Sequence, residues 1–352
     1  MKRLFFLIVS MTMLFSCEYQ DNGVTSINEV ISSHYLINGI VAGNLDTYIQ
    51  NNQIVRLTGK PGITTVTIGN ADLSKYEPCF VLYVATGNTP ETTVSSAIIK
   101  LDGMEVLNTS DFNNDGASYT FEVCNLTQTS ALTVEVRGAP GSFVNVWIEG
   151  KLKIPTEGLV AYYPFNSNVS DESGNEYHGT NNGATLTYDR FGRESSAYFF
   201  DGQSNIVINN TENLNFSSGS FTLATWLNFN SFMQDVCPLA KHIWAVGGWA
   251  LNIFEDKLTF YLDFIPRLTS DDIYSDGNWH FLVGVFDGTT QYLYIDGILI
   301  KTQTGALGYS NSTPITIGST TGGGFFTGSL DDIRIYNRAL SEQEVTSLLT
   351  EN

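Results

Sequence analysis

The chain has 352 residues, and its 36 Asp and Glu outnumber its 17 Lys and Arg, giving a formal net charge of −19. Hydrophobic residues make up 42% and aromatic residues 12% of the chain, which is enough for packed cores and excludes wholesale disorder. An acidic chain without a run of Lys and Arg is a poor partner for nucleic acid or anionic lipid head groups. The length indicates two domains, and 32 Gly residues favour turn-rich β structure.

Residues 1–17 are typical of an export signal. Lys2 and Arg3 precede an apolar run from Leu4 to Phe15. About twelve residues are too few to span a bilayer, which takes roughly twenty, whereas a charged start, an apolar middle and a small residue before the cleavage point define a secretory signal. No other stretch of the sequence is long and apolar enough to cross a bilayer.

Cys17 follows Leu14-Phe15-Ser16, which resembles the lipobox of bacterial lipoproteins except that Phe15 replaces the usual small residue. The resemblance implies acylation of Cys17 and a lipid anchor as the only membrane attachment, with residues 18–27 as a tether. Acidic residues after the cysteine, here Glu18 and Asp21, are seen in surface-exported lipoproteins of Bacteroidetes-type bacteria. We expect the chain in the bacterial cell envelope, anchored in the outer membrane, with surface exposure left open. An ordinary signal peptide with a chance cysteine is the alternative.

The other cysteines are Cys79, Cys124 and Cys237. An oxidising exterior permits one disulfide, and Cys79 and Cys124 lie in strand-like runs of the same predicted domain. Closing this loop would stabilise the fold by about 3–4 kcal/mol in the chain-entropy model. Two unpaired buried thiols on neighbouring strands are the alternative. Cys237 is then a buried free thiol, and the lack of paired ligand motifs argues against zinc.

Residues 28–153 show short β-rich runs separated by turn residues. Asp102-Gly103 predicts a tight hairpin, and the later runs alternate apolar and polar residues as half-buried strands do. Seven or more strands favour an Ig-like β-sandwich, which we expect to be a spacer or a second binding unit. The predicted strands are Ile54–Leu57, Thr64–Ile68, Phe80–Val84, Ala97–Leu101, Met104–Leu107, Thr120–Val123, Leu132–Val136 and Phe143–Ile148.

Residues 154–158 contain a proline and a glycine in a short polar stretch and predict a linker. A second domain over residues 159–350 carries weak motifs whose order is informative. They are Gly158–Asn166, Asp171–Asn175, Ala197–Gly202, Phe221–Leu227, Asp276–His280, Tyr292–Gly297 and Gly328–Ser341. In this order they resemble the laminin-G-like, concanavalin A-type jelly-roll family.

The local pattern agrees with this resemblance. Phe281–Phe286, Gln291–Ile295 and Ile298–Lys301, joined by Asp-Gly turns, predict three successive antiparallel strands. Ser341 to Glu344 forms a capping box before the last apolar residues, which predicts a short helix. The predicted fold class is all-β: an N-terminal Ig-like β-sandwich followed by a concanavalin A-like (laminin-G-like) jelly roll with a short C-terminal helix.

The resembled family often holds a structural calcium between an early loop and the last long strand. Calcium takes six to eight oxygen ligands, and by position Asp331 is the predicted ligand, with Asp201 and Asp171 as candidates to complete the site. Because neighbouring side chains of a strand face opposite ways, only one of Asp331 and the adjacent aspartate should face the site. The alternative for Asp331 is hydrogen bonding to loop amides, or a salt bridge to Arg334 or Arg338.

The sequence does not indicate catalysis. Glucanases of this general fold place an acid and a nucleophile on one strand face in a Glu-x-Asp-x-x-Glu pattern, which is missing here. The nearest pair, Glu255-Asp256, places its carboxylates on opposite faces at a turn. The histidines lie in no nucleophile-elbow or metalloprotease motif, and His280 is interpreted as a packing or turn residue. We predict a non-catalytic protein; a glycoside hydrolase or lyase, catalytic or accessory, is the alternative.

Ligand binding is the remaining class. Carbohydrate recognition pairs an aromatic ring with polar side chains, and Trp244 is the candidate ring because Trp147, Trp226 and Trp279 lie in strand patterns. The predicted function is a lipoprotein whose laminin-G-like domain binds a polysaccharide or other glycan, or a cell-surface protein. A purely structural or adhesive envelope protein is a further alternative. Loss of Lys2 and Arg3 would leave 15 basic and 36 acidic residues, and we interpret this acidity as turn chemistry and solubility.

Overall fold

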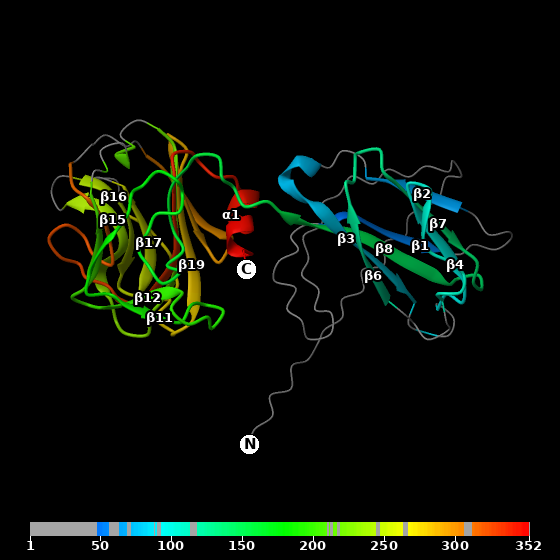
Figure 1. Cartoon of the computed structure of the whole chain (residues 1–352), viewed down its shortest axis with the longest axis horizontal. Coiled ribbons are helices and arrows are strands. Elements are labelled where there is room, and N and C mark those ends of the chain that lie inside the picture. Colours follow the sequence, from blue (N-terminus) through cyan, green and yellow to red (C-terminus); the bar gives the residue numbers. More distant parts are fainter. Residues whose placement is uncertain are drawn as a thin grey trace, which may run out of the picture. The chain divides into compact units, whose positions relative to one another are not determined.

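The computed structural model describes residues 48–55, 63–68, 72–87, 89, 93–112, 118–209, 211, 214–216, 219–243, 247–262, 267–305 and 312–351. The predicted signal peptide with Cys17, the tether and Trp244 lie outside the described residues. The chain forms two compact units (Figure 1). The second unit contains the chain from Gly150 onward, and the short segment Lys75–Glu77 also groups with it. In the described part of the chain, no helix is long and apolar enough to span a membrane.

The first unit is built from two four-stranded sheets. Its strands are β1 (Tyr48–Val55), β2 (Ile63–Thr67), β3 (Tyr76–Thr86), β4 (Ala97–Leu101), β5 (Met104–Leu107), β6 (Ser118–Cys124), β7 (Ala131–Val136) and β8 (Phe143–Leu152), with a 3₁₀ turn at Leu73–Lys75. One sheet has the order β1-β8-β3-β6 and the other β2-β7-β4-β5. Burial alternates along β3, β4, β7 and β8, so these strands bury one face. The Ig-like arrangement stays a prediction.

The predicted disulfide is present in the first unit. Cys79 of β3 and Cys124 of β6 are direct partners in the strand register and form the Cys79–Cys124 disulfide. Cys237 is a buried free thiol, as predicted, and burial raises its pKa to about 12.

The second unit is built from two antiparallel sheets. Its strands are β9 (Leu159–Tyr163), β10 (Thr180–Asn182), β11 (Thr185–Thr187), β12 (Ala197–Asp201), β13 (Asn205–Ile208), β14 (Phe221–Asn228), β15 (Gln234–Ile243), β16 (Gly247–Phe254), β17 (Lys257–Leu262), β18 (Leu268–Thr269), β19 (Trp279–Phe286), β20 (Thr290–Ile295), β21 (Ile298–Thr304), β22 (Ile315–Ile317) and β23 (Thr327–Tyr336). The seven-stranded sheet has the order β10-β13-β22-β15-β16-β17-β18. The eight-stranded sheet has the order β11-β12-β23-β14-β19-β20-β21, and β9 pairs with β23.

Side chains alternate along each strand, so each sheet turns one set of side chains inward. The inward side chains of the two sheets pack together into one apolar core. The inward residues of the seven-stranded sheet include Leu239, Leu251 and Phe260. They share the core with inward residues of the eight-stranded sheet such as Leu223 and Leu282. The outward side chains of each sheet are therefore separate surfaces.

The outer face of the eight-stranded sheet is covered by the helix α1 (Glu342–Leu349). The predicted capping box is confirmed: the Ser341 side chain accepts from the Glu344 N–H, and the Glu344 side chain accepts from the Ser341 N–H. Val345 and Leu348 pack with outward residues of the sheet, among them Ala224, Trp226, Phe281 and Val283. No helix among the described residues of this unit lies over the seven-stranded sheet, although outward side chains of that sheet such as Ala240 and Ala250 are 0% and 1% exposed.

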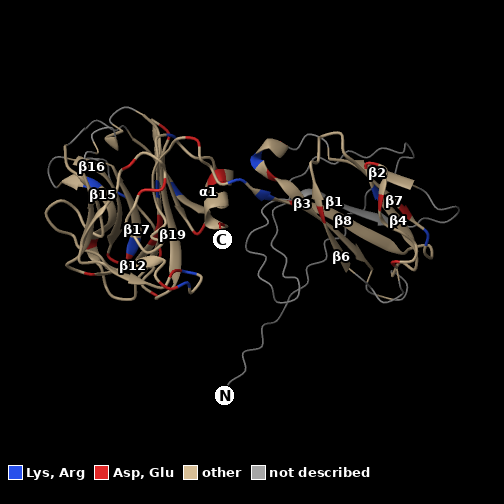
Figure 2. Cartoon of the chain, viewed as in Figure 1, with Lys and Arg blue, Asp and Glu red and all other residues tan. Residues whose placement is uncertain are grey.

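Among the described residues, Asp and Glu occur along the strands and loops of both units (Figure 2). Several act in turns: Asp287 Oδ1 accepts from the N–H groups of Thr289 and Thr290, both at 2.8 Å. Asp102 and Asp296 adopt positive φ beside a glycine at hairpin turns. These contacts agree with the interpretation of the acidity as turn chemistry.

Candidate functional site

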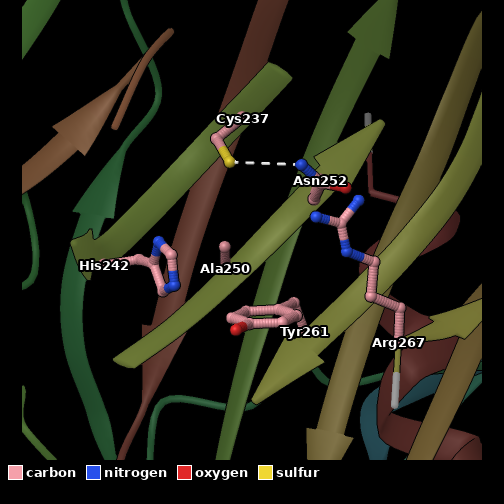
Figure 3. A pocket seen from close by; sticks show the side chains of 6 residues that line it. All are labelled: Cys237, His242, Ala250, Asn252, Tyr261 and Arg267. Carbon is pink, nitrogen blue, oxygen red and sulfur yellow. Dashed lines mark hydrogen bonds between the residues drawn. The ribbon is translucent and has the colours of Figure 1, made fainter. Parts of the chain in front are cut away.

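Outward side chains of β15, β16 and β17 surround a small cavity on the outer face of the seven-stranded sheet. We call it the outer cavity; it is lined by Cys237, His242, Ala250, Asn252, Tyr261 and Arg267 (Figure 3). Its volume is about 10 Å³, which is about the space that one water molecule needs. In β16, Trp249 and Leu251 belong to the core, so the alternation of the strand turns the small Ala250 and the polar Asn252 outward.

A β-bulge shapes one end of this cavity. Asp235 adopts φ 61°, and the pairing of β15 with β16 shifts register between Gln234 and Val236. Bulges re-aim side chains and are frequent beside functional sites. The Asp235 carboxylate meets Arg267 at two points, Nη1 to Oδ1 at 2.9 Å and Nη2 to Oδ2 at 3.0 Å. The second contact is a hydrogen bond and the first is an ion-pair contact, and together they hold the guanidinium beside Asp235.

Aromatic rings border the cavity beside the ion pair. The Arg267 guanidinium lies 4.7 Å from the Phe254 ring centroid and 5.7 Å from that of Tyr261. His242 meets the Tyr261 ring edge to face at 4.9 Å. The arrangement therefore combines an aromatic ring with an imidazole, an amide and a guanidinium, which are groups that bind hydroxyl-rich molecules.

Asp331 and Asp332 lie elsewhere, on the outer side of the eight-stranded sheet, and bind an arginine. Arg190 Nη1 lies 2.8 Å from Asp331 Oδ2 and 2.6 Å from Asp332 Oδ2. The expectation that only one of these adjacent carboxylates faces a given site is wrong. Asp332 adopts φ 46° where the register of β23 against β14 shifts, and this bulge turns both carboxylates toward Arg190.

The arginines expected beside Asp331 have other principal partners. Arg334 Nη2 lies 2.5 Å from Glu351 Oε2 and 3.8 Å from Asp332 Oδ1, while Arg338 pairs with Glu344. Burial, and then the neighbouring Asp332 carboxylate, raise the pKa of Asp331 well above its ordinary value.

The other predicted calcium ligands accept hydrogen bonds from nearby protein groups. Asp171 accepts from the N–H groups of Tyr162, Ser173 and Tyr177. Asp201 accepts from the N–H groups of the two turn residues that follow Gly202. In the described residues, none of the three predicted aspartates belongs to a group of three ligands within 4.8 Å of one another. These residues do not fit the predicted calcium site, because Arg190 already occupies the place of the cation at Asp331.

Sequence reasoning missed Asn252, Tyr261 and Arg267. Strand alternation is a signal that could have found the first two, since Asn252 and Tyr261 lie between core residues of adjacent strands. Arg267 follows no such pattern, because its place depends on the bulge at Asp235.

The comparisons with known proteins agree with the fold. Residues 200–346 match the family described as the concanavalin A-like lectin/glucanases superfamily. The second unit is therefore a concanavalin A-like domain, which confirms the resemblance to laminin-G-like jelly rolls and the all-β fold of this part. No curated protein matches the chain.

Solved structures show the same likeness. Domain 4 of AbnA, a GH43 extracellular arabinanase from Geobacillus stearothermophilus, in complex with arabinotriose, is 22% identical with a TM-score of 0.47; the match covers 55% of this chain and 98% of that chain. The binding domain of Paraclostridial Mosquitocidal Protein 1 is 20% identical with a TM-score of 0.48, covering 55% of this chain and 52% of that chain. The binding domain of Botulinum neurotoxin DC, in complex with rat synaptotagmin II, is 16% identical with a TM-score of 0.43, covering 56% and 52%. The chain thus spans about half the length of the toxin domains. At these identities and TM-scores the likeness supports no conclusion about ligands.

Proposed function

We propose that the protein is a non-catalytic, carbohydrate-binding lipoprotein of the bacterial cell envelope, and that the outer face of its seven-stranded sheet binds the glycan. The observation that carries this proposal is the meeting of Tyr261, Asn252, His242 and Arg267 around the outer cavity. Sugars present apolar C–H groups to aromatic rings and hydroxyls to planar polar side chains, and this face offers both. The envelope location rests on Cys17 and the residues before it.

The carboxylates near this face support binding without hydrolysis. Glycoside hydrolysis uses two carboxyl groups, roughly 5 to 9.5 Å apart, that flank the scissile bond. Among the described residues no carboxylate lines the outer cavity, and Asp235 beside it forms an ion pair with Arg267. A second catalytic carboxylate would have to come from elsewhere.

The test is binding of the purified full chain to a panel of polysaccharides, measured by affinity electrophoresis and calorimetry. Calorimetry also includes the trisaccharide arabinotriose, the ligand in one similar structure. We expect retention by at least one glycan without release of sugar, and at least a tenfold loss of affinity for Tyr261→Ala. Tyr188→Ala is the matched control because Tyr188 is 58% exposed and lies outside the outer cavity.

Two results would overturn the proposal. Retention of no glycan would favour a protein partner or a structural role. Release of sugar that is abolished by changing one carboxylate would show an enzyme.

A further inference from the structure

The amide of Asn252 has one satisfied end and one unsatisfied end. Its Nδ2 donates to Val236 O at 3.0 Å, to Asp235 Oδ1 at 3.2 Å and to Cys237 Sγ at 3.4 Å. Three acceptors at one end fix the orientation of the amide, since rotation by 180° would face oxygen with oxygen. Asn252 is only 3% exposed, and its Oδ1 is buried without a hydrogen-bond partner among the described residues.

A buried carbonyl oxygen without a donor is costly, so its position indicates where a donor belongs. Asn252 lines the outer cavity, whose volume of about 10 Å³ has room for one oxygen-sized group. Ala250 beside it keeps this space open because its side chain is a single methyl group. The missing donor is therefore as small as a water molecule or a single hydroxyl group.

The charges around the cavity favour an uncharged ligand. Arg267, its cationic group, is neutralised by Asp235 through two contacts. The Cys237 thiol stays protonated, because burial raises its pKa. The chain as a whole carries a formal charge of −19, which repels acidic polymers.

We propose that the domain recognises a neutral sugar by one hydroxyl group, which enters the outer cavity and donates its hydrogen bond to Asn252 Oδ1. This inference rests on the proposed glycan-binding function and specifies the class of ligand. The hydroxyl takes the place of one water molecule. Tyr261, which is partly exposed, is the aromatic ring against which the sugar ring lies.

The test measures binding of the full chain to arabinan, galactan and laminarin as neutral probes and to polygalacturonate as an acidic probe. We expect a neutral probe to bind and polygalacturonate to bind at least tenfold more weakly. Asn252→Leu removes the acceptor, and Ala250→Val fills the cavity while leaving Asn252 in place. Each variant should weaken neutral-glycan binding at least tenfold.

Ala339→Val is the matched control. Ala339 is a partly buried residue that packs with the outer cluster of the eight-stranded sheet and does not line the cavity, so this change should leave affinity unaltered. Melting curves establish that each variant is folded, and Ala250→Val keeps the test decisive if Asn252→Leu does not fold.

The outcomes separate this inference from the proposed function. Binding of no probe contradicts both. A second outcome is that Tyr261→Ala abolishes binding while Ala250→Val and Asn252→Leu leave it unchanged. This result would contradict the hydroxyl site but would still support glycan binding at the outer face. Equal affinity for polygalacturonate and the neutral probes overturns the preference for uncharged sugars.

Discussion

At the start of β19, His280 lies between two carboxylates from different turns. Its Nδ1 is 2.8 Å from Asp296 Oδ2, and its Nε2 is 3.2 Å from Asp276 Oδ1. The hydrogen bond to Asp296, despite partial burial, raises the pKa of His280. Hydrogen bonds from Asn278 hold the pKa of Asp276 at about 2. The imidazolium therefore links the turn before β19 to the turn between β20 and β21.

His280→Gln should reduce stability in a pH-dependent way. Because the folded-state pKa is raised, the stabilisation is fully present below the unfolded value of about 6.5 and is lost as pH rises through the higher folded-state pKa. Ion pairs with partly exposed groups contribute about 1 kcal/mol or less, so the difference should be a few degrees at most. Melting temperatures of both proteins across pH 5 to 9 test this, and a difference that does not shrink with rising pH would contradict it.

At the scale of elements, the bulge in β23 brings two acidic residues to one cation. Asp331 and Asp332 are 1% and 6% exposed, and Arg190 also lies over the Trp226 ring at 4.7 Å. Adjacent buried carboxylates repel each other unless a cation lies between them. Arg190 supplies this charge from a loop far away in sequence.

Arg190→Met should therefore destabilise the domain strongly, by about 3–5 kcal/mol, whereas Arg190→Lys should cost less. The melting temperature of the unaltered protein should be the same in calcium and in chelator. Arg137→Met is the matched control, since the side chains of its ion pair with Glu135 are 41% and 21% exposed and the change should cost little. A rise of the unaltered protein's melting temperature with calcium would restore the calcium hypothesis for Asp331.

The sequence predicts those features that depend on neighbouring residues. The strands Ala97–Leu101 and Met104–Leu107 coincide with β4 and β5, and the capping box at Ser341 is present, because periodicity and caps are local. Arg190 and Asp331 are 141 residues apart and meet only after the strands have paired. Gly284 is similar: a Cβ there would lie 2.5 Å from the Phe260 side chain, which only the packing of two sheets reveals.

At the scale of the whole molecule, the two units differ in the state of their cysteines. The disulfide closes a separation of 45 residues within the first unit. In the chain-entropy model such a loop stabilises by about 4 kcal/mol. The second unit contains the buried free thiol of Cys237 instead.

Calorimetry of the full chain should therefore show two unfolding transitions, one for each unit. Each transition should respond only to cysteine substitutions in its own unit. Cys79→Ala together with Cys124→Ala should lower the transition of the first unit by many degrees and leave the second in place. Cys237→Ala, as the control, should shift only the second transition. A common shift of both transitions in either variant would show that the units unfold as one.

The helix α1 on one outer face has a consequence for how chains act together. Because α1 packs on the eight-stranded sheet, we place the single proposed site on the other sheet, and each chain is monovalent through that site. A polysaccharide repeats its sugars, so several chains held by the proposed lipid anchor would engage one polymer at the same time. Their joint avidity can exceed the single-site affinity by about 10²–10⁴-fold, so weak individual sites suffice for retention. Retention of a polymer would then depend steeply on the surface density of the protein.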